Sequence, residues 1–346
     1  HIFMKHLFIT VSAALISFFA AAQEASLLKL DVEARVDYMQ EYQAGAKIND
    51  ASGFKGKYLN IRMDGKLTDN VSYSYRQRLN KPNKDATFFD ATDWITVNYQ
   101  LKNWTLSGGK QVVGIGGFEY DGAPIDLYFC SEYWNNIACY QYGASLAWDT
   151  ESKNDRLMFQ FCESPFRRNA LNTENDEMFA YNMMWIGSHG FYSSLYSLNF
   201  IEYLPGRFIN YIVLGNRFNF GDFRLDLDFM NRAVSMKDLF GKDFSIMCEL
   251  KWSPMNSLDI FAKVTHDRNV SENTGDWCVA PGTDITRLGG GLEFYPIKDS
   301  KALRLHLNCC YTYGKTSGMT VLQDKQTIID AGITWKMNML NLKRKP

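Results

Sequence analysis

After residue 23, the sequence contains no apolar run of the roughly 20 residues that a membrane-spanning helix requires. It has few prolines, only 8, and shows no repeat, low-complexity tract or linker between domains. The net charge is −1, so no general attraction to nucleic acid or anionic lipid is expected. These absences argue against a helical membrane protein and a nucleic-acid-binding protein, and they predict a single domain.

Motifs for catalysis and metal binding are also missing. Three histidines follow the N-terminal segment, His189, His266 and His306, and the sequence contains no GxSxG or HExxH motif. His266 stands next to Asp267 and could act as a general base, but no nucleophile accompanies it in a recognisable pattern. We therefore expect no enzymatic activity, no cofactor and no metal site.

The cysteines form no recognisable framework. There are 7 of them without a CxxC pair, at Cys130, Cys139, Cys162, Cys248, Cys278, Cys309 and Cys310. An odd number with scattered spacing argues against a disulfide framework and against a zinc site. Cys130 and Cys139 could pair, although most of the cysteines are expected to be small buried side chains.

The N-terminus has the pattern of a secretory signal. A lysine precedes the apolar run from Leu7 to Phe19, and three alanines follow it. Cleavage is expected before Gln23. We therefore predict a signal peptide over residues 1–22, in which residues 1–3 are an upstream extension, and a single exported domain over residues 23–346.

The rest of the sequence is rich in alternating apolar and polar residues. Residues 223–229 read FRLDLDF, and similar alternation recurs in residues 59–64, 244–252 and 303–308. Because successive side chains of a strand point to opposite faces, each segment predicts a strand with one apolar and one polar face. A soluble β-sandwich can produce the same alternation.

The spacing of these segments distinguishes the two fold classes. Sixteen strands are predicted, at residues 30–42, 55–67, 70–79, 93–101, 103–113, 137–149, 155–163, 177–186, 190–201, 207–218, 222–231, 243–252, 257–267, 284–295, 302–312 and 326–337. Short turns alternate with longer polar loops between them, which is typical of an outer-membrane barrel. We therefore predict an all-β fold, a transmembrane antiparallel β-barrel of about 16 strands, with both termini in the periplasm.

Bilayer physics explains this form. Every backbone polar group needs a partner in hydrocarbon, so a spanning sheet must close on itself, and about sixteen strands leave an aqueous bore. Tryptophans near strand ends are expected at the membrane interfaces, unless they are ordinary core residues. They are Trp94, Trp104, Trp148, Trp185, Trp252 and Trp335.

The longest connection, from Gly114 to Asn136, begins like a dinucleotide-binding turn. The third glycine of that motif is replaced by Glu119 and no helical pattern follows, so a phosphate site is not predicted. As the third long loop of a wide barrel, the segment is expected to fold into the lumen, where glycines allow sharp turns. A solvated surface loop is the alternative. The acids of the predicted constriction are Glu119, Asp121, Asp126 and Glu132.

Basic residues on the predicted strands would line the pore, several of them opposite this loop. They are Arg62, Lys66, Arg76, Arg78, Lys110, Arg224, Arg287 and Arg304. Charged side chains in such positions are used to select ions in pores. The polar faces also carry acids in nearly equal number, so the sequence predicts neither an anion nor a cation preference.

The strings GGKQ, GGFEYDGAPIDLYF and SEYWNN resemble the phosphate-selective porin O and P family as it occurs in Bacteroidetes-type bacteria. The resemblance covers roughly residues 30–337 and is strongest from Gly108 to Trp148. It implies a sixteen-stranded porin, assembled as a homotrimer, that passes small anions such as phosphate by diffusion. Family members draw in phosphate with stacked Arg and Lys, whereas the third loop of this chain is acidic.

The resemblance and the strand pattern together predict a porin of the bacterial outer membrane. Its partners would be membrane lipid and small hydrophilic solutes or anions, with no nucleic acid. Two alternatives are a soluble exported β-sandwich that binds sugars through exposed aromatic rings, and an outer-membrane barrel hydrolase. A barrel with an apolar belt requires detergent, whereas a soluble sandwich does not.

Overall fold

The computed structural model describes residues 26–80, 87–167, 177–235, 239–271, 273–316 and 325–343. The predicted signal peptide, residues 1–22, lies outside these described residues. Among them, no helix combines the length and the apolar character needed to cross a bilayer.

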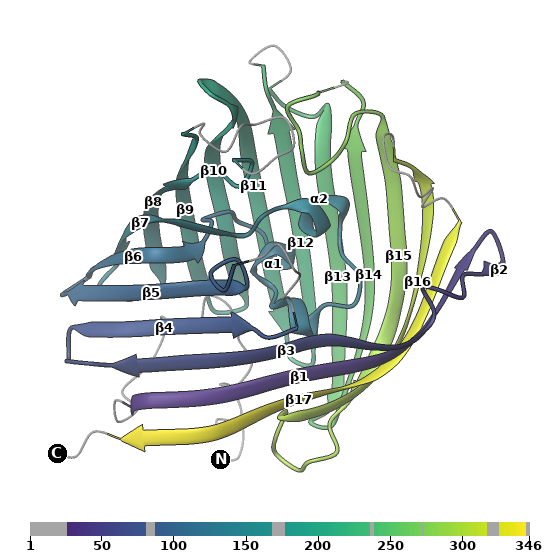
Figure 1. Cartoon of the computed structure of the whole chain (residues 1–346), viewed down its shortest axis with the longest axis horizontal. Coiled ribbons are helices and arrows are strands. Elements are labelled where there is room, and N and C mark those ends of the chain that lie inside the picture. The colour runs from purple at the N-terminus through teal and green to yellow at the C-terminus, as the bar shows by residue number, and fades with distance from the viewer. Residues whose placement is uncertain are drawn as a thin grey trace.

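Most of the described chain is β-strand (Figure 1). The strands are β1 (Ser26–Gln43), β2 (Ala46–Lys47), β3 (Gly53–Lys66), β4 (Val71–Arg78), β5 (Thr92–Leu101), β6 (Trp104–Val112), β7 (Tyr140–Asp149), β8 (Asp155–Glu163), β9 (Phe179–His189), β10 (Tyr192–Leu204), β11 (Arg207–Phe220), β12 (Phe223–Ala233), β13 (Asp243–Met255), β14 (Leu258–Asn269), β15 (Thr283–Phe294), β16 (Leu303–Lys315) and β17 (Gln326–Lys343). Three short helical segments separate β6 from β7: α1 (Phe118–Asp121), η2 (Pro124–Asp126) and α2 (Glu132–Asn136).

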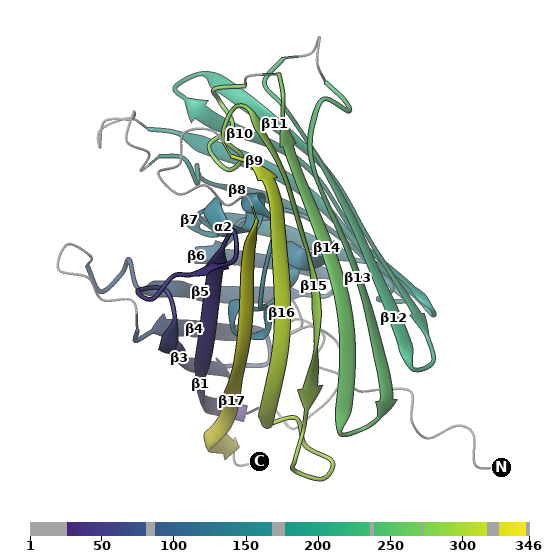
Figure 2. The same cartoon turned by 90° about the vertical axis from the view of Figure 1, so that its right-hand side faces the viewer.

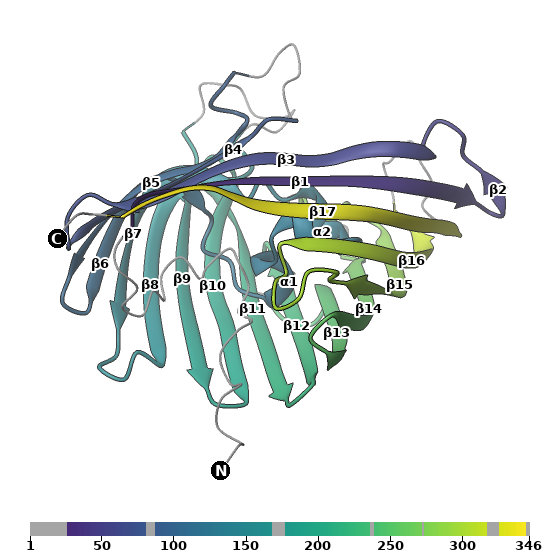
Figure 3. The ribbon, with the colours of Figure 1, turned by 90° about the horizontal axis from the view of Figure 1, so that it is seen from below.

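The strands form one closed barrel, which Figures 2 and 3 show from the side and from below. Neighbouring strands run antiparallel, and β1 pairs with β3 on one side and with β17 on the other. The two-residue strand β2 only extends the hairpin between β1 and β3. The sixteen long strands coincide with the sixteen predicted ones, and the prediction of a closed antiparallel barrel is confirmed.

The alternation of side chains gives the barrel two different faces. On β5, Val97, Tyr99 and Leu101 are exposed on the outer face, whereas Asn98 between them is buried in the lumen wall. An outer belt of apolar side chains suits lipid, and a polar inner face suits water, so the sequence period of two produces a membrane barrel.

The tryptophan prediction needs one correction. Trp104, Trp185, Trp252 and Trp335 are between 37% and 51% exposed and lie near the short-turn ends of their strands, as expected for an interface belt. Trp94 is 7% exposed. Its ring lies inside the barrel because the Arg62 and Arg76 guanidinium groups lie over it, 5.7 Å and 4.9 Å from the centre of the indole.

The lumen is not polar throughout, which corrects the expectation of a uniformly wet bore. On β11, Ile209, Tyr211 and Val213 point inward and are almost fully buried. They belong to an apolar cluster, the lumen core, which also contains Val113, Ile115, Tyr120, Tyr133, Ile137, Cys162, Phe166, Met178, Ala180, Ile201, Met230, Cys278 and Val279. Protein therefore fills the part of the lumen beside β8 to β12.

Candidate functional site in the barrel lumen

The connection between β6 and β7, residues 113–139, lies inside the barrel and is called the inner loop here (Figures 1 and 3). It carries α1, η2 and α2, and five of its apolar side chains belong to the lumen core. Contacts with strands on several sides of the barrel hold it in place.

Two glycines let the inner loop approach the wall closely. The Gly116 amide donates to Ser197 Oγ at 2.8 Å, and a Cβ at Gly116 would lie 2.5 Å from the Leu195 carbonyl oxygen. Gly117 has a φ of 95°, a conformation that side chains disfavour. Both positions therefore require glycine so that the loop can pack closely against the wall. These packing glycines, rather than a phosphate site, account for the resemblance to a dinucleotide-binding turn.

Two wall aspartates bind the amides at the starts of the loop helices. Asp228 on β12 accepts hydrogen bonds from the Phe118 and Glu119 amides at 2.9 and 2.7 Å. Asp267 on β14 accepts one from the Glu132 amide at 2.7 Å. Amides that would bind an anion at a helix start are thus satisfied by carboxylates of the barrel, which fixes the loop to β12 and β14.

The acids of the inner loop pair with bases of the wall. Glu119 contacts Lys263 Nζ at 2.8 Å, and Glu132 contacts Arg287 Nη2 at 2.5 Å. Arg287 and Lys263 therefore both fix the loop rather than presenting free charge to solutes.

Asp126 sits between two further bases. It contacts Arg304 Nη1 and Lys336 Nζ, each at 2.8 Å. Burial opposes its ionisation, but Lys336 and Arg304 together hold the pKa of Asp126 below its usual value. Arg304 was predicted as a pore-lining residue, whereas Lys336 was not, because the predicted last strand ended near it.

Arg35 is a loop contact that the sequence analysis missed. Its Nη1 donates to the carbonyl oxygens of Ile125 and Leu127 at 3.2 and 2.6 Å, so β1 holds the middle of the loop. The alternation along β1 places Arg35 on the polar face, and that signal could have identified it.

Asp121 has no ion pair comparable to those of the other loop acids. It is 8% exposed, and its Oδ1 is buried without a hydrogen-bond partner. Burial raises the pKa of Asp121 from 3.8 to about 7, although Arg217 opposes the rise. The docked loop therefore prefers the protonated carboxyl.

Loop docking should consequently depend on pH. Because the folded pKa is raised, the docked state binds an extra proton between about pH 4 and pH 7, so docking loses stability as the pH rises through that range and levels off above it. We expect single-channel recordings of the wild type to become noisier from pH 5 to pH 7, and those of Asp121→Asn to change less over the same range. Equal pH dependence in the two proteins would contradict this assignment.

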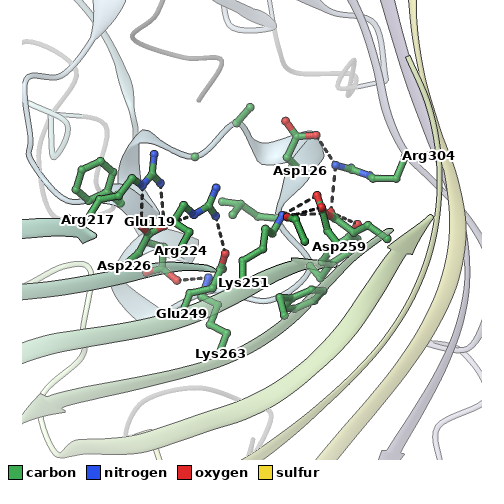
Figure 4. Close-up of a pocket in the computed structure, with 18 of the residues that line it drawn as sticks. Glu119, Asp126, Arg217, Arg224, Asp226, Glu249, Lys251, Asp259, Lys263 and Arg304 are labelled. Atoms are coloured by element: carbon green, nitrogen blue, oxygen red, sulfur yellow. Dashed lines mark hydrogen bonds and ion pairs between the residues drawn. The ribbon is translucent and has the colours of Figure 1, made fainter. Parts of the chain in front are cut away.

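A cavity of about 340 Å³ lies between the inner loop and the wall from β11 to β17 (Figure 4). Its lining contains equal numbers of bases and acids. The bases are Arg217, Arg224, Lys251, Lys263, Lys301, Arg304 and Lys336, and the acids are Glu119, Asp126, Asp222, Asp226, Glu249, Asp259 and Glu293. The formal charge of the lining is therefore zero.

The charges of this cavity are interlinked. Arg224 contacts Asp226 at 3.2 Å and Glu249 at 3.0 Å, and Lys251 contacts Glu293 at 2.8 Å. Figure 4 shows Arg224 and Glu249 pointing toward each other in this cavity. A solute that enters meets paired charges of both signs, which favours polar solutes without selecting one sign.

A different arrangement occurs on β3 and β4. Arg76 and Arg78 both contact the carboxylate of Asp93, at 3.2 and 3.1 Å, while Arg62 contacts Asp64 at 2.6 Å. Three guanidinium groups thus share two carboxylates in this group, which we call the basic cluster: Arg62, Arg76 and Arg78. The basic cluster exceeds Asp64 and Asp93 by one positive charge, before the acids Asp31 and Glu33 of the neighbouring β1, opposite Arg62 and Asn60, are counted.

The basic cluster lies opposite the docked α1. In the closed ring of sixteen long strands, β4 and β12 are eight strands apart in either direction. The inner loop is held against β12 by Asp228. The wall that carries Arg76 and Arg78 therefore faces the inner loop across the barrel.

The two remaining predicted bases lie elsewhere. Lys66 lies at the short-turn end of β3, opposite Ser72 of β4. The prediction that Lys110 lines the pore is wrong. Lys110 pairs with Ile95 and Tyr142, both exposed on the outer face, and its Nζ donates to the Phe89 carbonyl. Directly opposed residues of neighbouring strands share a face, so Lys110 lies outside.

Comparison with known proteins gives a family match. The model for the family described as phosphate-selective porin O and P matches residues 28–186. No curated protein sequence matches the chain.

Several solved structures share the fold. An anion-selective porin from Comamonas acidovorans is 14% identical, and the match covers 90% of this chain and 100% of that chain with a TM-score of 0.63. OmpT, an outer membrane protein of Vibrio cholerae in its trimer form, is 11% identical over 90% and 100% of the two chains, with a TM-score of 0.60. A mutant of the Rh. blastica porin is 11% identical over the same shares, with a TM-score of 0.55.

Proposed function

Since this chain belongs to the phosphate-selective porin O and P family and is a porin of the bacterial outer membrane, we propose that it admits small anions by passive diffusion past its basic cluster. The observation that carries this proposal is the sharing of Asp93 by Arg76 and Arg78. Inorganic phosphate and chloride belong to the proposed class of solutes.

The charge balance of the lumen supports an anion preference. The cavity beside β11 to β17 is neutral, whereas the basic cluster exceeds Asp64 and Asp93 by one positive charge. At about 8 Å from one unit positive charge in water, an anion gains about 0.5 kcal/mol and a cation loses as much. The difference of about 1 kcal/mol corresponds to about a sixfold preference for the anion, which suits a general porin better than a tight binding site.

The proposal also covers the export, the domain organisation and the assembly of the chain. We propose that residues 1–22 are removed on export, that residues 23–346 form the single barrel domain, and that three chains assemble. The trimer form of the Vibrio cholerae protein and the family resemblance support the assembly.

We also propose that the chain is a channel without catalysis. His266 and Asp267 are neighbours on β14, but His266 Nδ1 contacts Thr286 Oγ1 at 2.9 Å, whereas Asp267 binds the amides of α2 inside the barrel. Successive residues of a strand point to opposite faces, so this pair cannot act as one acid–base unit.

Paired substitutions test the anion proposal. In planar bilayers with a KCl gradient, we expect the wild type to prefer chloride, and added phosphate to reduce the chloride current. Arg78→Gln should lower the anion-to-cation permeability ratio about sixfold, and Asp93→Asn should raise it by a similar factor, because each changes the local charge by one unit and acts on both ions in opposite directions.

A surface charge provides the control. Lys153→Gln removes one positive charge from an exposed periplasmic turn and should leave the permeability ratio unchanged. A cation-preferring wild type, or equal shifts in Arg78→Gln and Lys153→Gln, would refute the role of the basic cluster.

A further inference from the structure

Three potential metal ligands meet where the barrel closes. Asp37 of β1, His306 of β16 and Asp330 of β17 place their side chains together on the inner face. His306 Nε2 lies 3.4 Å from Asp37 Oδ1 and 3.1 Å from Asp330 Oδ1. This group, the seam cluster, spans the pairing of the first and last strands, which completes the ring.

The imidazole of the seam cluster is buried without a hydrogen bond. His306 is 4% exposed, and neither ring nitrogen has a partner with hydrogen-bond geometry. A buried polar nitrogen without a partner costs about 1–3 kcal/mol. The two carboxylate oxygens lie 3.4 and 3.1 Å from Nε2 without meeting hydrogen-bond geometry.

The spacing of the three atoms fits a metal ion. Zinc binds nitrogen and oxygen ligands at about 2.0–2.1 Å in a tetrahedron, which places neighbouring ligand atoms about 3.3 Å apart. The observed separations of 3.4 and 3.1 Å bracket this value. One imidazole with two carboxylates, and one position left for water, is a donor set that divalent transition metals accept.

Neighbouring residues hold the ligands in place. The Arg35 side chain donates to both oxygens of Asp37 at 2.7–3.0 Å and leaves Oδ1 directed at His306. Asn308 Nδ2 donates to Asp330 Oδ1 at 2.5 Å. Such outer contacts orient metal ligands in known sites.

A glycine provides the space for the cluster. A Cβ at Gly332 would lie 2.6 Å from His306 Cε1 and would also clash with Asp37. Any larger residue at this position would push the imidazole and the carboxylate apart. The Tyr128 ring of the inner loop lies 4.6 Å from the His306 ring and covers the cluster on the lumen side.

From this geometry we propose that the seam cluster is a binding site for one divalent transition metal ion, with Zn²⁺ as the best-fitting case. The ion links β1, β16 and β17 and stabilises the closed ring. It is independent of the solute that the pore passes. Because all three ligands are buried, the ion enters during folding or transient opening of the seam, so loading is tested by refolding.

The experiment compares metal content after refolding. Full-length chains are refolded from urea into detergent with Zn²⁺ or with EDTA, desalted, and analysed by elemental mass spectrometry. We expect one Zn²⁺ per wild-type chain, and at least a tenfold lower content in His306→Ala. Removing the outer contact with Asn308→Ala should weaken Zn²⁺ binding about 10- to 100-fold.

A stability readout and a matched histidine complete the test. Zn²⁺ should raise the temperature of the heat-modifiable gel shift in the wild type and in His189→Ala, but not in His306→Ala, because a ligand stabilises only the state that binds it. His189 is the matched control, since it also contacts an aspartate, Asp155, but at an exposed turn.

If His306→Ala fails to fold, Asp330→Asn provides the same comparison with a side chain of equal size. Equal Zn²⁺ contents in the wild type and in the folded seam variants would overturn the proposal. The cluster would then be a histidine between two carboxylates without a metal function.

Discussion

Single-channel recordings of Asp228→Ala should show frequent steps to a larger conductance than that of the wild type. Asp228 accepts hydrogen bonds from the two amides that begin α1, at 2.9 and 2.7 Å. A buried donor left without a partner costs about 1–3 kcal/mol, so the substitution removes about 2–6 kcal/mol of loop docking. A loop that leaves β12 no longer narrows the lumen.

Two further variants make this result specific. Asp228→Asn keeps one carbonyl oxygen as an acceptor and should fall between the wild type and the alanine variant. Asp155→Ala removes a carboxylate that contacts His189 at a short turn, away from α1 and from the basic cluster, and should keep the wild-type conductance. An Asp228→Ala channel with steady wild-type conductance would show that the loop does not depend on this anchor.

The second large effect is expected at Arg232. This guanidinium and its partner Asp276 are both fully buried, with Nε and Oδ2 2.5 Å apart. Arg232→Met leaves Asp276 as a buried unpaired charge, which typically costs about 3–5 kcal/mol. We expect the temperature of the heat-modifiable gel shift to fall, and Trp277 fluorescence to shift to longer wavelength as its loop leaves the lumen core.

Removing the negative charge of Asp276 as well should recover most of the stability lost in Arg232→Met. Asp276 also accepts hydrogen bonds from the Cys278 and Val279 amides, so asparagine is the replacement that keeps an acceptor there. The double variant Arg232→Met/Asp276→Asn should melt closer to the wild type than Arg232→Met does. A double variant less stable than the single one would mean that the ion pair is not the source of the effect.

The strands could be predicted because lipid imposes the same rule along the whole chain. A residue such as Leu225 must face hydrocarbon, and its neighbours Arg224 and Asp226 must face away from it, so the period of two is visible without any tertiary information. The turn and loop lengths then set the number and direction of the strands.

The interior of the barrel was less predictable. On β11 the lumen-facing residues Ile209, Tyr211 and Val213 are as apolar as the lipid-facing ones, because the inner loop packs on them. Alternation alone cannot indicate that a loop from another part of the chain covers a strand. The same limitation applies to Trp94, whose inward position depends on Arg62 and Arg76 of neighbouring strands.

Some of the charged residues in the lumen could be predicted from the sequence, but their ion-pair partners could not. Arg287 and Arg304 were identified as lumen residues by their polar faces, but their pairing with Glu132 and Asp126 depends on the loop path. Lys110 was assigned to the wrong face although it alternates in step with Trp104 and Leu106, which are exposed on the outer face. The seam cluster draws its ligands from both ends of the chain, so no local spacing reveals it.

The lumen core has an electrical consequence. Dry protein fills the β8 to β12 side, so the proposed route for ions runs off the barrel axis, beside β3 and β4. A low-dielectric wall concentrates field lines in the remaining water, so an ion on this proposed route would cross a steep part of the applied voltage. Because the guanidinium groups on β4 lie on one side of the route only, we expect the current to differ between the two polarities of the membrane voltage.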